Sequence, residues 1–208
     1  MGDKKVVELW KKMNKWALEG FKKTYELYGV KFDKEYYESE IYEEGKKMVL
    51  EGLKKGLFKK RNDGAVFINL GEELREKVLL RADGTSVYIT QDLYLAKLRD
   101  KEFNLNSSIY VVGNEQEHHF KVLFSILKKL NFKFADNLYH LSYGMVNLPG
   151  GRMKSREGNV VDADDLILEI QDLVKKELSS RAKLSKKELE KRSLTIALSA
   201  IKYFLLKA

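Results

Sequence analysis

The chain has 208 residues, of which 44% are hydrophobic, so it is long enough for one folded domain with a sizeable core or for a domain with a small appendage. It contains no cysteine, which excludes disulfides, thiolate catalysis and thiolate metal sites. Lysine and arginine outnumber aspartate and glutamate by 39 to 31, giving a net charge of +8. This excess fits either a polyanionic partner or an evenly charged surface rich in lysine and glutamate.

Neither end of the chain shows a targeting or membrane segment. The residues after Met1 run directly into an amphipathic segment and do not resemble a signal peptide. The most apolar late stretch, 194–206, is too short to span a bilayer and is interrupted by Lys202. We therefore expect a cytoplasmic protein without a membrane partner.

Residues 1–64 are predicted to be helical. Apolar side chains recur at three- and four-residue steps from Val6 to Tyr25, as on one face of an amphipathic helix. A second helix is expected from about Tyr36 to Leu53, before a turn at Asn62-Asp63-Gly64.

Short apolar runs bounded by turn residues then predict strands at 65–68, 78–80 and 86–90, the last two separated by an Asp-Gly turn, with a helix from about Gln91 to Arg99. Residues 108–113 are almost continuously apolar, as expected for a strand that is covered on both faces. A helix with apolar residues from Phe120 to Leu130 and a strand at 138–146 follow. Strand, helix and strand in this order favour a parallel, right-handed crossover unit.

Residues 149–159 form a basic loop flanked by glycines, and two helices are predicted after it. Asp162 or Asp164 can cap the first of these helices, and Ser185 with Glu188 forms a capping box for the second. The sequence therefore predicts an α/β fold with parallel strands and crossover helices between two helical segments.

Three segments contain residues suited to chemistry. In the first, Tyr88 and Asp92 lie where a predicted strand gives way to a helix, at the edge of the sheet where open α/β folds bind ligands. Tyr88 as a core residue and Asp92 as a helix cap would explain them structurally. The functional interpretation is a site for a cationic group.

The second segment, 112–119, places polar groups after another predicted strand. Adjacent His118 and His119 raise the question of zinc, but neighbours on a helix point apart and the only other histidine, His140, lies in a predicted strand. We therefore expect no metal site, and favour hydrogen bonding to a substrate or nucleotide.

In the third segment, the basic loop, Arg152, Lys154 and Arg156 alternate with other residues before Gly158. Such a loop can close over phosphates and neutralise charge that develops during phosphoryl or nucleotidyl transfer. A solvated surface loop is the structural alternative. The spacing of a Walker loop is absent.

In this order and spacing the segments resemble the arginyl-tRNA synthetases, a class I aminoacyl-tRNA synthetase family. The resemblance covers nearly the whole chain, and the residues that carry it are Leu80-Arg81-Ala82-Asp83-Gly84-Thr85, Tyr88-Ile89-Thr90-Gln91-Asp92, Tyr110-Val111-Val112-Gly113, His140-Leu141-Ser142-Tyr143-Gly144-Met145-Val146 and the basic loop. It implies a partial Rossmann-like class I catalytic domain. Residues 1–64 would belong to the connective region, 65–160 to the second half of the catalytic domain, and 161–208 to the stem-contact region and the start of the anticodon-binding domain.

The resemblance also implies roles for individual residues. Arginine would be bound by Tyr88, Asp92 and Gln116, and a carboxylate suits the planar guanidinium because it accepts paired, charge-assisted hydrogen bonds. ATP would be bound by Gly113, Gly144, Met145, Val146 and Met153. The catalytic residues would be Arg152, Lys154, Ser155 and Arg156, in the place of the KMSKS signature, with Arg152 replacing its first lysine, Lys154 its first serine and Ser155 its second lysine.

The implied reaction joins L-arginine to tRNA(Arg) through an arginyl-adenylate, with ATP and Mg²⁺ as a substrate complex and no tightly bound cofactor. The HIGH signature of the class has no counterpart here, since no histidine precedes His118. We therefore expect little adenylate formation by this chain alone, and a need for an N-terminal partner that carries HIGH. The chain would then be a gene fragment, one half of a split gene or a truncated piece of the enzyme. The alternative is a non-catalytic, synthetase-like remnant that binds tRNA or a protein.

Overall fold

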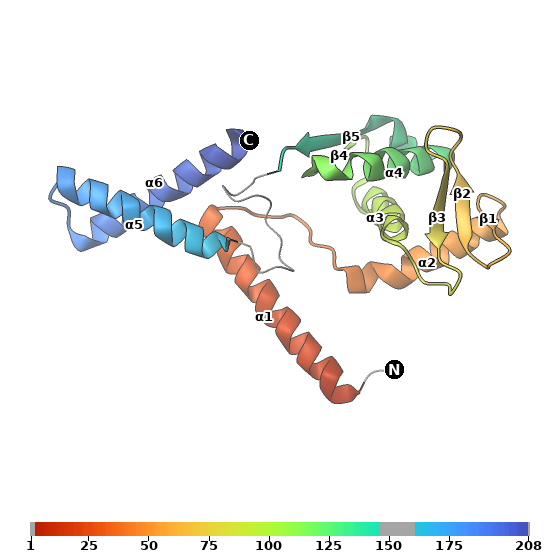
Figure 1. Cartoon of the computed structure of the whole chain (residues 1–208), viewed down its shortest axis with the longest axis horizontal. Helices are drawn as coiled ribbons and strands as arrows, with labels where there is room; N and C mark the ends of the chain where they lie inside the picture. The colour runs from red at the N-terminus through yellow and green to blue at the C-terminus, as the bar shows by residue number, and fades with distance from the viewer. Residues whose placement is uncertain (1–2, 146–160, 208) are drawn as a thin grey trace. The chain divides into compact units, whose positions relative to one another are not determined.

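The computed structural model describes residues 3–145 and 161–207 (Figure 1). These residues belong to two compact units, one formed by residues 34–145 and the other by the two ends of the chain. The helices and strands, in chain order, are α1 (Lys4–Tyr28), α2 (Glu38–Lys54), β1 (Lys59–Lys60), β2 (Val66–Asn69), β3 (Glu76–Leu80), α3 (Tyr88–Phe103), β4 (Ser108–Gly113), the 3₁₀ helix η1 (Asn114–Gln116), α4 (Glu117–Lys129), the 3₁₀ helix η2 (Lys133–Asn137), β5 (Leu138–Tyr143), α5 (Ala163–Arg181) and α6 (Lys186–Lys207).

The first predicted helix is confirmed as α1. The side chain of Asp3 caps it by accepting a hydrogen bond from the backbone N–H of Lys5 at 2.9 Å. It ends at Gly29, whose φ of 67° is the left-handed conformation in which glycine commonly terminates helices. No residue of α1 is buried, so its apolar side chains are exposed.

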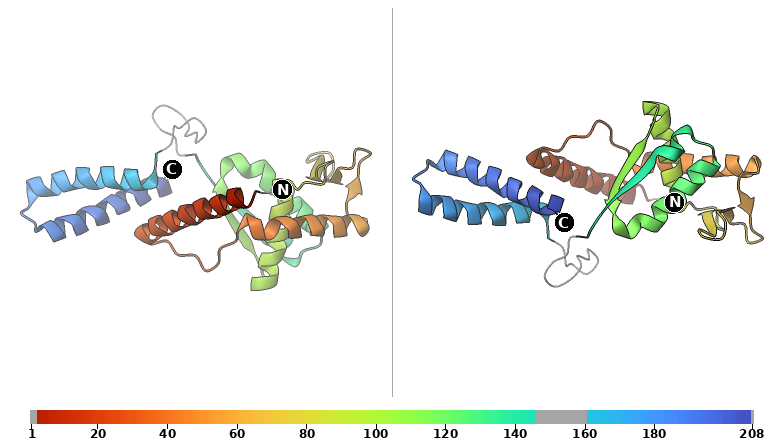
Figure 2. Two further views of the ribbon diagram at one scale, coloured as in Figure 1. Left: turned by 90° about the horizontal axis from the view of Figure 1, so that it is seen from below. Right: turned by 90° about the horizontal axis from the view of Figure 1, so that it is seen from above.

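Helices α5 and α6 pack side by side (Figures 1 and 2). The buried side chain of Gln171 on α5 donates a hydrogen bond to Oγ of Ser193 on α6 at 3.3 Å. Half of the predicted capping box is present, because Ser185 Oγ accepts from the backbone N–H of Glu188 while the Glu188 carboxylate pairs with Arg192 instead. Asp162 takes the cap position of α5 without a side-chain hydrogen bond.

None of the helices in the described part of the chain combines the length and the hydropathy needed to cross a membrane.

In the unit of residues 34–145, β1, β2 and β3 form an antiparallel sheet in that order. The predicted turns that bound these strands are confirmed. Asp63 accepts a hydrogen bond from the N–H of Ala65, and Asp83 accepts one from the N–H of Thr85, each at 2.9 Å. Such bonds from an aspartate to the backbone two residues on stabilise tight turns.

The prediction of a strand at 86–90 is wrong, because most of this run belongs to a helix. Ser86 makes a single bridge with Leu80, and α3 already begins at Tyr88. The run contains the β-branched residues Val87, Ile89 and Thr90, which favour strands locally, but tertiary packing overrides that preference. Ile89 and Thr90 are buried. The Thr90 hydroxyl donates a hydrogen bond to the backbone carbonyl of Leu79 in β3.

The predicted order of strand, helix and parallel strand is confirmed. Strands β4 and β5 pair in parallel, from Ser108 opposite Leu138 to Gly113 opposite Tyr143, and α4 connects them (Figure 2). One face packs against α4, where the rings of Tyr110 and Phe120 have centroids 5.1 Å apart.

The expectation that the strand at 108–113 is covered on both faces is wrong for the described residues. Ile109 and Val111 are 64% and 62% exposed, and Tyr139 and Leu141 of β5 are exposed beside them. Side chains alternate along a strand, so only one face of this two-stranded sheet meets α4. The second strand also ends at Tyr143, earlier than the predicted residue 146, which lies outside the described residues.

Replacing Gly45 by alanine is expected to lower the free energy of unfolding by about 1–2 kcal/mol. Gly45 is where α2 approaches α3, and a Cβ at this position would lie 2.9 Å from the backbone carbonyl oxygen of Thr90. Gly20 of α1 is the matched control, since a Cβ there meets nothing within 4 Å. Gly20→Ala should instead stabilise its helix by up to about 1 kcal/mol. Urea denaturation followed by circular dichroism measures both, and equal effects of the two changes would contradict the close approach.

Candidate functional site

The carboxyl ends of β4 and β5 lie next to each other, because Gly113 and Tyr143 are opposite in the parallel register. The first turns of α3 and α4 meet near this edge through a contact between their side chains. Ligands of open α/β sheets bind beyond the carboxyl ends of the strands. This edge is therefore the candidate site.

Tyr88 and Asp92 lie one turn apart on α3. Tyr88 is 78% exposed, so it is not a core residue. Val87 occupies the cap position of the helix, so Asp92 does not cap it. Both structural explanations considered for this pair are therefore wrong, and a phenol and a carboxylate are left accessible at the start of α3.

The side chain of Asp92 contacts His119, a residue that was not predicted to belong to the site. Nε2 of His119, on the first turn of α4, lies 2.6 Å from Oδ2 of Asp92. The side chain of His119 is 22% exposed and that of Asp92 37%, so a ligand can still reach the carboxylate. The only sequence signal for His119 was its spacing of three residues from Gln116, which places both on one side of a helix.

Gln116 lies at the cap position of α4, exposed and one turn before His119. The structure thus places Tyr88, Asp92 and His119 on adjoining helix starts, with Gln116 at the beginning of the same α4. Hydroxyl, carboxylate, amide and imidazole groups together offer both acceptors and donors to a polar, cationic ligand.

The residues expected to bind ATP are described only in part. Gly113 is buried at the end of β4, and a Cβ there would lie 3.4 Å from Sδ of Met145 and 3.8 Å from the ring of Tyr143. Gly144 and Met145 follow β5 and are exposed. Val146, Met153 and the basic loop residues Arg152, Lys154, Ser155 and Arg156 lie outside the described residues.

Partly buried side chains of β4 and β5 lie next to this edge. His140 of β5 lies with Nε2 2.9 Å from the carbonyl oxygen of Val112, and its ring centroid is 4.4 Å from that of Phe120. Burial raises the pKa of the Tyr110 hydroxyl, an effect that the nearby Arg99 guanidinium opposes. The contacts of His140 thus link β5 to β4 and α4. The described ranges 3–145 and 161–207 contain no cluster of three or more metal-ligating side chains.

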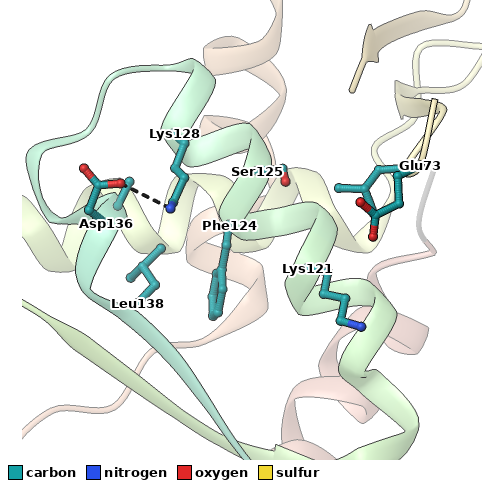
Figure 3. Close-up of a pocket in the computed structure, with 9 residues that line it drawn as sticks. Glu73, Lys121, Phe124, Ser125, Lys128, Asp136 and Leu138 are labelled. Carbon is teal, nitrogen blue, oxygen red and sulfur yellow. Dashed lines mark ion pairs between the residues drawn. The ribbon is translucent and has the colours of Figure 1, made fainter. Parts of the chain in front are cut away.

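Two pockets lie on α4. One of about 200 Å³ is lined by Glu117, Phe120, Lys121, Phe124, His140 and Ser142. The other, of about 280 Å³, includes Leu138, which begins β5, and is lined on one side by Lys128 and Asp136, which form an ion pair of 3.2 Å (Figure 3). Because the candidate site lies where β5 ends, this second pocket is at the opposite end of the strand and is separate from it.

Comparison with known proteins gives a consistent result. Residues 1–208 match the family model for "tRNA synthetases class I (R), catalytic domain". The chain is 54% identical over 208 residues to an arginine–tRNA ligase of Treponema denticola, a match that covers 98% of this chain and 35% of that protein. It is 52% identical over 210 residues to an arginine–tRNA ligase of Parabacteroides distasonis, covering 99% of this chain and 35% of that protein.

Solved structures show the same relationship. The crystal structure of arginyl-tRNA synthetase from Plasmodium falciparum matches with a TM-score of 0.79 and 27% identity, covering 100% of this chain and 35% of that one. The Thermus thermophilus arginyl-tRNA synthetase matches with a TM-score of 0.74 over 95% of this chain and 39% of that one, and at 20% identity it supports the fold alone. The chain thus spans 35% of the length of the curated relatives it matches. With its parallel β4–α4–β5 unit and a family match along its entire length, the chain belongs to the class I arginyl-tRNA synthetase catalytic-domain family.

Proposed function

We propose that the chain is part of an arginine–tRNA ligase in which Tyr88, Asp92 and Gln116 bind the substrate arginine. One observation carries the proposal: Asp92 presents a partly exposed carboxylate, fixed by His119, beside the exposed Tyr88 at the ligand-binding edge of the sheet. A guanidinium can form two parallel, charge-assisted hydrogen bonds with a carboxylate, whereas an ammonium acts as a point charge. The site therefore suits arginine better than lysine.

In the proposed reaction, a carboxylate oxygen of arginine attacks the α-phosphorus of ATP. The bond from that phosphorus to the bridging oxygen breaks, and pyrophosphate leaves with Mg²⁺. The terminal ribose hydroxyl of tRNA(Arg) then attacks the carbonyl carbon of the adenylate and AMP leaves. Gly113, Gly144, Met145, Val146 and Met153 are proposed to hold the nucleotide.

The basic loop is proposed to neutralise the phosphate charge that develops in the first step, as positioned cations do in other transfers of this kind. Its cationic residues are Arg152, Lys154 and Arg156, with Ser155 between the last two. The 208 residues contain no HIGH sequence, so we propose that adenylate formation needs an N-terminal half that carries it.

The proposal includes the division of the chain into a connective region (1–64), a catalytic half (65–160) and a region that begins the anticodon-binding domain (161–208). It also includes a cytoplasmic location.

Isothermal titration calorimetry of the chain with arginine, lysine and ATP tests the amino-acid site. Arginine should bind at least about tenfold more tightly than lysine, because only arginine matches the carboxylate with two donors. Equal binding of both amino acids would contradict the assignment. Binding of tRNA without binding of either amino acid would favour the non-catalytic remnant.

Arginine-dependent ATP–pyrophosphate exchange tests the need for a second half. With tRNA present, the chain alone should give no exchange above background, and adding the HIGH-containing half of a related enzyme should give measurable exchange. Exchange by the chain alone would refute the requirement for a second half.

A further inference from the structure

We propose that His119 is a positioning residue for arginine binding: its imidazole fixes the carboxylate of Asp92 in the orientation that receives the guanidinium. The inference rests on the proposed function, because that function assigns arginine to Asp92. The observation that carries it is the 2.6 Å contact between Nε2 of His119 and Oδ2 of Asp92, across 27 residues of sequence and between two helices.

The imidazole is well placed to act as a fixed support. His119 lies on α4, and its ring stands edge-on to that of Phe120, with centroids 5.6 Å apart and an angle of 88° between the planes. Phe120 is 7% exposed and belongs to the main core cluster. The donor is therefore attached to a packed helix.

The hydrogen bond leaves room for a substrate. An ionised carboxylate only accepts hydrogen bonds and has about four lone-pair sites on its two oxygens. His119 uses one site on Oδ2, so Oδ1 and the second site on Oδ2 of Asp92 stay available to the two-pronged guanidinium. Because a carboxylate only accepts hydrogen bonds, Nε2 is the donor in this contact.

Fixing the carboxylate before arginine arrives lowers the cost of binding, since an acceptor already in the bound orientation loses less conformational freedom. His119 does not touch the substrate in this account and acts only through Asp92. Loss of a hydrogen bond to a charged group corresponds to about a tenfold loss of affinity.

The test compares three variants of the chain by calorimetry with arginine: His119→Ala, His119→Gln and His118→Ala. His119→Ala should weaken arginine binding about tenfold. His119→Gln should restore it to within about threefold of the original, because the glutamine amide can place an N–H near the position of Nε2. His118 is the matched control, since it is the adjacent histidine on α4 and is exposed, and His118→Ala should leave the affinity unchanged.

A second readout does not depend on any variant. In ¹⁵N spectra of the histidine rings of the original chain, saturation with arginine should shift the Nε2 signal of His119, because its acceptor acquires a cationic partner, and leave His118 unchanged. The inference is overturned if arginine binds the original chain while the His119 signal stays fixed, or if folded His119→Gln loses as much affinity as folded His119→Ala. Absence of arginine binding to the original chain refutes the proposed function itself, which distinguishes the two failures.

Discussion

Asp92→Asn is expected to weaken arginine binding by about 100-fold, or close to 3 kcal/mol. Asparagine keeps the size of the side chain but removes its charge and replaces one acceptor oxygen with a donor amide. The guanidinium then faces an N–H group and loses the paired, charge-assisted hydrogen bonds. Calorimetry with arginine measures the change directly.

Asp100→Asn is the matched control for this prediction. Asp100 lies on the same helix, α3, two turns further along, so the substitution removes the same charge from the same element. It should change arginine affinity less than about twofold, because salt screens most of the interaction with an exposed charge two helical turns from the site. Comparable losses in the two variants would mean that Asp92 attracts arginine only through long-range charge.

Leu123→Ala is expected to lower the free energy of unfolding by about 3 kcal/mol. Leu123 is fully buried on α4, within the cluster that joins this helix to α3 and the strands. Truncation removes apolar contacts and leaves a cavity that the neighbours fill only in part. Urea denaturation followed by circular dichroism gives the change from the transition midpoint.

Leu50→Ala serves as its control, because Leu50 is a leucine of α2 that is 39% exposed. Its loss should be below about 1 kcal/mol, since much of the side chain already contacts water. If Leu123→Ala costs no more than Leu50→Ala, α4 is not anchored as described, and the placement of His119 and Gln116 loses its support.

The parts of the fold that follow a clear local pattern could be predicted from the sequence. The amphipathic period predicts α1, and the apolar runs either side of α4 predict the parallel pair β4 and β5. The run 86–90 could not be assigned in this way. Its β-branched residues prefer a strand locally, whereas in the structure Ile89 and Thr90 are buried as part of α3.

The residues of the candidate site also differ in whether they could be predicted from the sequence. Tyr88 and Asp92 could be proposed from one short segment, and the structure leaves both accessible. His119 could not, because the bond to Asp92 joins residues 27 positions apart and depends on how α3 packs against α4. The adjacent histidines also suggest a metal site, whereas in the structure His119 contacts the carboxylate of Asp92.

The carboxylate of Asp92 is proposed to recognise the positive, planar end of arginine at the edge formed by β4, α3 and α4. Titration of the ¹⁵N-labelled chain with arginine and with citrulline, its neutral isostere, tests this most directly. Arginine should shift backbone amide signals at residues 88–92 and 113–119, and citrulline should shift none of them. Equal shifts with both ligands, or shifts confined to the Lys128–Asp136 pocket of Figure 3, would contradict it.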